Sequence, residues 1–117
     1  MSYHPGTHLI ATLKTENQQS LGQYLEFSHL LDKLIQQYDL QKIGEVYHDF
    51  SPGGFTAIVC LSESHLSIHT WPEYGKINMD IYLSNYLREN DGTVHSIYDK
   101  IKLHFGATVE NEQFLKR

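Results

Sequence analysis

The segment Ile77-Asn-Met-Asp-Ile-Tyr-Leu-Ser84 alternates strictly between apolar and polar side chains. Because successive side chains of a β-strand point to opposite faces, this period of two predicts a strand with one dry face. The dry face consists of Ile77, Met79, Ile81 and Leu83. We therefore expect a sheet that buries one side of this strand in the core.

Several other segments are rich in β-branched or apolar residues, which favours strands. They are residues 6–13, 42–50, 55–61 and 67–71, with a last strand near 107–114. The turn signal Ser51-Pro52-Gly53-Gly54 precedes 55–61, and Pro72 ends 67–71. The continuous apolar run of 55–61 predicts a buried strand.

Two segments carry the period of an amphipathic helix. The first is expected at about residues 18–38, and its stripe is Leu21, Leu25, Leu30, Leu31, Leu34, Ile35 and Tyr38. The second follows an N-cap at 91–93 and ends at Gly106, and its stripe is Val94, Ile97, Tyr98, Ile101 and Phe105 or His104.

The expected order is β-α-β-β-β-α-β, and it predicts an α+β fold. Two helices with one apolar face each suit a two-layer α/β sandwich, with the helices on one face of a largely antiparallel sheet. A dimer partner is the simplest cover for the other face, although antiparallel sheets tolerate one wet face. A domain of 117 residues buries only about two-thirds of its unfolded surface. We therefore expect an active site to borrow walls from a second subunit.

Composition and charge fit one domain, residues 1–117, working in the cytoplasm. Nine basic against 14 acidic residues give a net charge of −5, which argues against nucleic acid or an anionic membrane as partner. No segment approaches the ~20 apolar residues of a membrane span, and the start lacks the regions of a signal peptide. The single cysteine, Cys60, allows no intrachain disulfide and no Cys-based zinc cage.

The densest polar cluster is Ser-Glu-Ser-His-Leu-Ser-Ile-His-Thr-Trp-Pro-Glu at residues 62–73. Hydroxyls, imidazoles and carboxylates at this density are typical of nucleophilic and proton-transfer chemistry. A metal shared by His65 and His69 is disfavoured, because four residues of extended chain span roughly 13 Å. No metal site is expected.

A Ser-His dyad of Ser64 and His69 meets a parity problem. Residues an odd number apart on one strand face opposite sides, and no G-x-S-x-G elbow is present. A bend or a second subunit would therefore be needed to bring the two side chains together. The remaining alternative is that these side chains only satisfy backbone groups of a sheet.

Residues 63–73, Glu-Ser-His-Leu-Ser-Ile-His-Thr-Trp-Pro-Glu, resemble the ESHxxIHTWPE signature of bacterial S-adenosylmethionine decarboxylase proenzymes. The resemblance extends to Gly6-Thr-His-Leu9, to His48-Asp-Phe50, and to Tyr74-Gly75 followed by a strand with Asp80. It implies a pyruvoyl enzyme that decarboxylates S-adenosylmethionine and so supplies the aminopropyl donor for spermidine. It also implies a homodimer with sites between the subunits.

The same resemblance implies self-cleavage between Glu63 and Ser64. Ser64 Oγ would attack the carbonyl of Glu63, and elimination from the resulting ester would leave a pyruvoyl group, derived from Ser64, at the new N-terminus. That group condenses with the amine of the substrate and takes up the electrons that departing carbon dioxide leaves behind. No external cofactor is then required.

Four further positions receive roles from the resemblance. His69 is the proton-transfer residue of self-processing, and Thr56 stands where the family has a Ser that assists processing and contacts substrate. Phe50 matches an aromatic residue that stacks on adenine. Glu73 matches a carboxylate that accepts hydrogen bonds from ribose hydroxyls.

Ser84 departs from the family pattern, which usually reads Thr-Cys-Gly where this chain reads Leu83-Ser84-Asn85. The family Cys donates a proton to the decarboxylated carbon. Because a hydroxyl is several pK units less acidic than a thiol, Ser84 is a poor direct donor. Two alternatives stay open: a pyruvoyl decarboxylase of another amino acid such as arginine or ornithine, or a non-catalytic relative that serves as a dimer partner.

Overall fold

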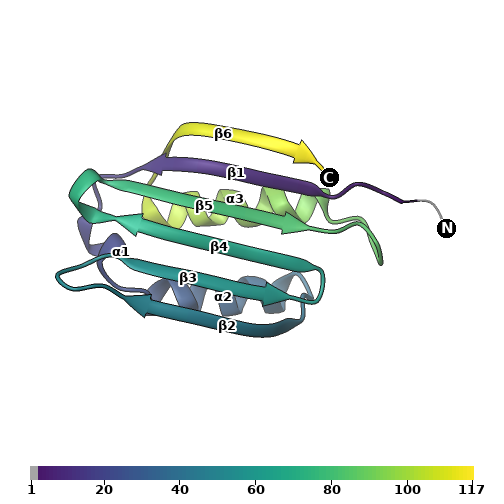
Figure 1. The fold of residues 1–117 in the computed structure, drawn as a ribbon, viewed down its shortest axis with the longest axis horizontal. Coiled ribbons are helices and arrows are strands. Elements are labelled where there is room, and N and C mark those ends of the chain that lie inside the picture. Colours follow the sequence, from purple (N-terminus) through teal and green to yellow (C-terminus); the bar gives the residue numbers. More distant parts are fainter. Residues whose placement is uncertain (1–2) are drawn as a thin grey trace.

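The computed structural model describes residues 3–117, which form a six-stranded antiparallel sheet in the order β2-β3-β4-β5-β1-β6 (Figure 1). The helices pack behind one face of this sheet. The elements are β1 (Thr7–Lys14), α1 (Gln18–Gly22), α2 (Leu25–Gln37), β2 (Lys42–Asp49), β3 (Phe55–Leu61), β4 (Ser64–Trp71), the 3₁₀ turn η1 (Pro72–Tyr74), β5 (Lys76–Leu83), α3 (Asp91–Phe105) and β6 (Thr108–Lys116). The predicted α+β two-layer fold is confirmed.

The order of elements differs from the expected one in two places. Four strands, β2 to β5, lie between α2 and α3, whereas the expected order counted only three. The segment predicted at 67–71, which that order left out, is the full strand β4 (Ser64–Trp71). The helix expected at 18–38 is broken after Gly22, where Gln23 is extended. Glycine is a poor helix former, and the carbonyl of Gly22 accepts the N–H of Gly54 (3.0 Å). This hydrogen bond joins the end of α1 to the β2–β3 loop.

The core lies between the helices and the inner face of the sheet. The dry face predicted for β5 is buried, and so is the predicted stripe of α3, with Phe105 rather than His104 as its last member. In α2 the buried residues include Phe27, which packs on Phe55 and Phe105, whereas Leu25 is 57% exposed. Each such buried side chain contributes about 1.5 to 3 kcal/mol. A register slip of one residue would lose this burial, so the register is firmly set.

The outer face of the sheet turns toward the viewer in Figure 1, and no element of residues 3–117 covers it. On β3 the inner residues Phe55, Ala57, Val59 and Leu61 are buried, while Ile58 and Cys60 are exposed. The prediction of a wholly buried strand at 55–61 is therefore wrong. The reason is that helices cover only one side of an antiparallel sheet, so even an apolar run can have a wet face.

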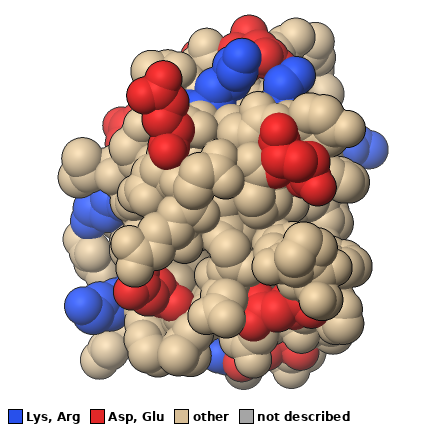
Figure 2. Space-filling view, turned by 90° about the vertical axis from the view of Figure 1, so that its left-hand side faces the viewer, with Lys and Arg blue, Asp and Glu red and all other residues tan. Residues whose placement is uncertain are grey.

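Charges on one end of the molecule are mixed rather than segregated. Figure 2 shows acidic and basic side chains interspersed around uncharged residues on the side that lies at the left of Figure 1. Among residues 3–117, no helix is long and apolar enough to span a bilayer.

Candidate active site

The polar side chains of β4 stand in rows across the outer face. Residues two apart on a strand share a face, so His65, Ser67 and His69 all lie on the outer side. The register places His65 opposite Tyr82, Ser67 opposite Asp80 and His69 opposite Thr56. The uncovered face of the sheet therefore carries most of the cluster that the sequence singled out.

The peptide bond between Glu63 and Ser64 is held in an unusual geometry. Its carbonyl oxygen, on Glu63, accepts the backbone N–H of Ser84 (2.8 Å). Ser64 has a φ of 136°, a region that residues other than glycine rarely adopt. Such a conformation costs on the order of 1 to 3 kcal/mol and persists only where surrounding contacts impose it. Strain and a polarised carbonyl thus coincide at one peptide bond.

The side chain of Glu63 provides those contacts. It is 7% exposed, and it accepts hydrogen bonds from Arg88 Nε (3.1 Å) and Nη2 (2.8 Å) and from Asn90 Nδ2 (2.8 Å). The hydrogen bond from Arg88, aided by that from Asn90, lowers the pKa of Glu63 against the opposing effect of burial. Asn90 Nδ2 also donates to the carbonyl of Ser84 (2.9 Å). Asn90 therefore links the side chain of Glu63 to Ser84, the residue whose N–H contacts the Glu63 carbonyl.

Sequence reasoning missed Arg88 and Asn90. Neither belongs to a motif with fixed spacing. The sequence predicts the N-cap at residues 91–93, whereas α3 has Asn90 at its N-cap position. The available signal was weak: Arg88 is one of two arginines in an acidic chain. Its partner, Glu63, lies 25 positions away.

Asp80 organises a second group on the outer face. One oxygen, Oδ2, lies 2.7 Å from His8 Nε2 and 2.7 Å from His65 Nε2, and the other accepts the hydroxyl of Ser67. Burial works to raise the pKa of Asp80, but the hydrogen bonds from Ser67, His8 and His65 outweigh it and hold this pKa below its usual range. The carboxylate is therefore ionised at neutral pH, and both of its oxygens accept hydrogen bonds.

The ligand-type atoms of His8, His65 and Asp80 lie within 4.8 Å of one another, a spacing that a metal ion could bridge. However, Arg117 Nη1 lies 3.1 Å from His8 Nδ1. Because a guanidinium only donates, Nδ1 is the acceptor and Nε2 carries the hydrogen. That tautomer donates to Asp80 and offers no lone pair there, so the cluster is satisfied by its own hydrogen bonds.

The remaining predicted residues line a hollow of about 300 Å³ at the other end of β4. Phe50, Thr56, His69 and Glu73 all contribute to its wall, together with Trp71. Thr56 Oγ1 is hydrogen-bonded to His69 Nδ1 across the two strands. Phe50 is half-exposed, so its ring is accessible to a ligand.

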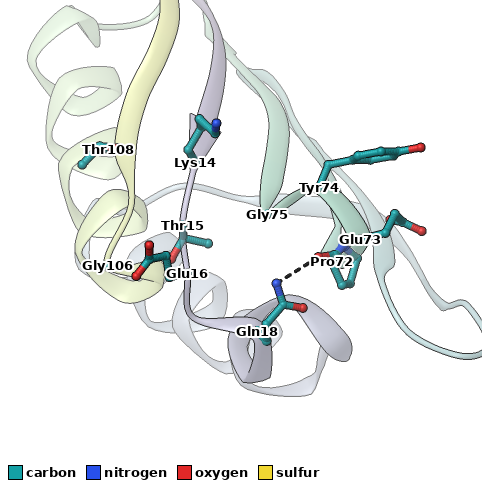
Figure 3. A pocket seen from close by; sticks show the side chains of 10 residues that line it. All are labelled: Lys14, Thr15, Glu16, Gln18, Pro72, Glu73, Tyr74, Gly75, Gly106 and Thr108. Atoms are coloured by element: carbon teal, nitrogen blue, oxygen red, sulfur yellow. Dashed lines mark hydrogen bonds between the residues drawn. The ribbon is translucent and has the colours of Figure 1, made fainter.

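A larger hollow, of about 780 Å³, shares only Glu73 with the predicted site (Figure 3). Gln18 of α1 donates to the carbonyl of Pro72 (2.9 Å) across it, and the side chains of Glu73 and Tyr74 extend outward from η1. Apart from Glu73, it contains none of the residues to which the sequence assigned chemistry. We therefore place the candidate site at the smaller hollow and at the strained peptide.

The predicted residues thus form two groups that do not meet within one chain. Glu63, Ser64 and Ser84 lie at one end of β4, and the group around His69 lies at the other. Five residues of strand separate Ser64 from His69 by about 16 Å. Side chains of one chain cannot cross that distance. Within one chain, distance along β4 rather than the face of the sheet therefore keeps Ser64 apart from His69.

These features define an α+β protein whose polar chemistry is gathered at the uncovered face and one hairpin of an antiparallel sheet. The sequence profile of the family described as S-adenosylmethionine decarboxylase matches residues 7–117. The chain belongs to this family, as the signature at 63–73 predicted.

Individual relatives agree with the profile. The chain is 40% identical over 77 residues to the S-adenosylmethionine decarboxylase proenzyme of Archaeoglobus fulgidus, covering 66% of this chain and 69% of that one. It is 33% identical over 97 residues to the proenzyme of Thermoplasma acidophilum, covering 83% and 74%. For the proenzyme of Aquifex aeolicus the values are 38% over 77 residues, 66% and 57%. The matched stretches thus span between 57% and 74% of these relatives.

A solved structure shares the fold. The crystal structure of the adenosylmethionine decarboxylase from Aquifex aeolicus superimposes with a TM-score of 0.85 at 27% identity. The superposition covers 99% of this chain and 92% of that one.

Proposed function

We propose that residues 1–117 are a single S-adenosylmethionine decarboxylase-like domain that cleaves itself between Glu63 and Ser64. The product decarboxylates S-adenosylmethionine in the cytoplasm and supplies the aminopropyl donor for spermidine. Family membership supports the reaction class. The observation that carries the proposal is the strained peptide itself: Ser64 at φ 136°, with the carbonyl of Glu63 held by Ser84.

The residues around Ser64 fit a catalytic group formed at that position. A pyruvoyl group made from Ser64 would supply a sink for the electrons left by carbon dioxide. Ser64 begins β4 and pairs with Leu61 and Leu83, so β3 and β5 would keep the new terminus in place after cleavage. No external cofactor is needed, and Ser84 stands beside this terminus as the candidate proton donor.

The smaller hollow supplies groups for the nucleoside part of the substrate. The exposed ring of Phe50 offers a face for adenine, and the carboxylate of Glu73 can accept hydrogen bonds from two ribose hydroxyls. Thr56 and His69, already hydrogen-bonded to each other, offer a hydroxyl and an imidazole at the same place. We assign Thr56 to both processing and substrate contact.

A homodimer would join the two halves of the site. A two-fold axis that lies in the plane of the interface, perpendicular to β4 near Ser67, would stack the two outer faces. It exchanges the ends of the strand and brings the partner's His69 toward Ser64. The exposed apolar residues Ile10, Val46 and Ile58 on the outer face favour burial by a second copy. In this arrangement each site takes its nucleophile from one chain and its imidazole from the other.

Ser84 supports a second candidate function. A serine in the donor position is consistent with a pyruvoyl decarboxylase retuned to another amino acid, such as arginine or ornithine, or with a non-catalytic dimer partner. A free amino acid would use neither Phe50 nor Glu73, whereas both residues line the hollow. We therefore favour S-adenosylmethionine.

Intact mass measurement followed by a carbon dioxide release assay tests the proposal. We expect two fragments, residues 1–63 and 64–117, the second without a free amino terminus, and release from S-adenosylmethionine. Efficient release from arginine or ornithine alone would establish the second candidate. A chain that keeps one intact mass after prolonged incubation would establish the non-catalytic relative.

A further inference from the structure

We infer that His65 is the general base that activates Ser64 for self-cleavage, and that Asp80 positions His65 for this step. The inference rests on the proposed function, because it concerns the cleavage at Glu63–Ser64. It assigns the first proton transfer to a residue of the same chain, beside the nucleophile, whereas the role of His69 requires the partner.

The contact that carries the inference joins neighbouring residues. Ser64 Oγ lies 3.3 Å from His65 Nδ1, and His65 Nε2 lies 2.7 Å from Asp80 Oδ2. In a regular strand, side chains of adjacent residues point to opposite faces and do not meet. Here Ser64 has a φ of 136°, outside the strand region. The strained backbone therefore accompanies a contact that a regular strand would not allow.

The tautomer of His65 suits a base. A carboxylate accepts hydrogen bonds only, so the nitrogen that faces Asp80 carries the hydrogen. In the neutral ring the other nitrogen, Nδ1, then has a free lone pair, and this is the atom that faces Ser64 Oγ. Hydroxyl, imidazole and carboxylate thus follow one another as in a nucleophile–base–orienter chain. The Oγ–Nδ1 distance is long for a hydrogen bond, as is common before the reacting atoms close in.

Further contacts fix the carboxylate. Ser67 donates to the Asp80 oxygen that His65 does not use, and His8 shares the oxygen that it does use. Arg117 lies beside the far nitrogen of His8, so that nitrogen accepts and the hydrogen sits on Nε2, facing Asp80. Asp80 is therefore held from three sides, and the plane of the His65 ring follows from it.

Ester formation takes two proton transfers, and both pass through His65. Ser64 Oγ forms a bond to the carbonyl carbon of Glu63, and its proton moves to His65 Nδ1. The electron pair of the carbonyl moves onto its oxygen, which the N–H of Ser84 already contacts. When the carbon–nitrogen bond breaks, the proton on His65 passes to the departing nitrogen of Ser64. The products are an ester between Glu63 and Ser64 Oγ, a free amine, and a neutral imidazole.

Ester formation can be measured apart from the later elimination. Neutral hydroxylamine cuts an ester but leaves an amide intact, so fragments released by hydroxylamine report the ester. The chain is made by cell-free translation, and intact masses are followed over time with and without hydroxylamine. The variants are His65→Gln, His69→Gln, and His29→Gln as the control, since His29 is an exposed residue of α2.

We expect His65→Gln to slow ester formation by about 10²- to 10⁴-fold, the usual contribution of a positioned base. His69→Gln should still form the ester, so hydroxylamine should release fragments from it. His29→Gln should behave as the natural chain does. In His65→Ala, added imidazole should restore part of the rate, which tests the role even if His65→Gln folds poorly.

Asp80 is tested as a positioning residue by a double variant. Asp80→Asn should slow ester formation in the natural chain but add little to the loss in His65→Ala, because it acts through His65. Independent, additive losses would overturn the positioning role.

The measurements distinguish an error in the role of His65 from an absence of self-cleavage. If the natural chain forms the ester and His65→Gln forms it within about threefold of the same rate, His65 is not the base, and the proposed function stands. If the natural chain gives neither fragments nor hydroxylamine-sensitive ester, self-cleavage itself is wrong, and the inference falls with it.

Discussion

The backbone N–H of Ser84 donates to the carbonyl oxygen of Glu63 across 2.8 Å. This contact connects the end of β5 to the peptide bond proposed for cleavage, although the two residues are 21 positions apart in the chain. The backbone and the side chain of Ser84 therefore have separate roles. Its backbone N–H contacts the carbonyl of the peptide proposed for cleavage, while its side chain stands at the position where the sequence resemblance predicts a thiol.

Ser84→Cys should raise turnover of S-adenosylmethionine. A thiol is a far better proton donor than a hydroxyl, and positioned acids contribute about 10²- to 10⁴-fold. Cleavage at Ser64 should change little, because the backbone N–H is retained. Carbon dioxide release and intact mass measure the two effects separately.

The same variant should also last longer during turnover. A poor donor allows protonation of the wrong carbon, which would transaminate the catalytic group and inactivate the enzyme. Progress curves with excess substrate should therefore bend for the natural chain and stay straighter for Ser84→Cys. Equal rates and equal lifetimes would move the donor elsewhere, with Tyr82, His65 or water next to test.

Ser64→Ala should abolish self-cleavage, because it removes the attacking oxygen. Thermal unfolding should be close to that of the uncleaved natural chain, since Ser64 Oγ makes a single hydrogen bond within the described residues. Mass spectrometry gives the first result and circular dichroism the second. Fragments from Ser64→Ala would show that another group cuts the chain.

Mixing Ser64→Ala chains with His69→Ala chains should restore some cleavage. In a heterodimer one site keeps both Ser64 and the partner's His69, while the other site has lost both. Each variant alone should remain largely uncut. Absence of rescue, with heterodimers demonstrated by sedimentation or native mass spectrometry, would place the two residues in one chain's chemistry.

Phe50→Ala and Glu73→Gln should each weaken use of S-adenosylmethionine by about 1 to 3 kcal/mol, through lost stacking and lost charge-assisted hydrogen bonds. The measured quantity is kcat/KM. Tyr74→Ala is the matched control, because Tyr74 lines the larger hollow but not the smaller one. A greater loss in Tyr74→Ala would move the substrate to the larger hollow.

Arg88→Gln should destabilise the uncleaved chain, studied in the Ser64→Ala background, by about 1 to 3 kcal/mol at pH 7, because it removes charged hydrogen bonds from the buried Glu63. Glu63 has a lower pKa in the folded chain than its ordinary 4.5. Its contribution is therefore fully present above that ordinary value and is lost as the pH falls through the lower, folded-state pKa.

Chemical denaturation at pH 7 and in acid measures this difference. The loss caused by Arg88→Gln should shrink as the pH falls. Lys42→Gln is the control, because Lys42 pairs with the exposed carboxylates Asp32 and Glu45, and surface pairs contribute little. A pH-independent effect of Arg88→Gln would mean that the charge of Glu63 is not what Arg88 stabilises.

The layers of the fold follow from local patterns in the sequence. The alternation in β5 and the helical stripe of α3 state which side chains are buried, because strand and helix periods depend on local backbone geometry alone. The motif at 63–73 likewise identified the family. The helical pattern at residues 18–38 could not show that the helix breaks after Gly22, because the hydrogen bond at the break comes from the distant Gly54.

Which of the candidate residues meet depends on the tertiary structure. Ser64 and His69 belong to one motif yet lie at opposite ends of β4, whereas Glu63 meets Arg88 and Asp80 meets His8 from distant parts of the chain. Periodicity reports the face on which a residue lies, but contacts across a sheet depend on strand order and register. These follow from how the whole chain packs its core, and no local pattern encodes them.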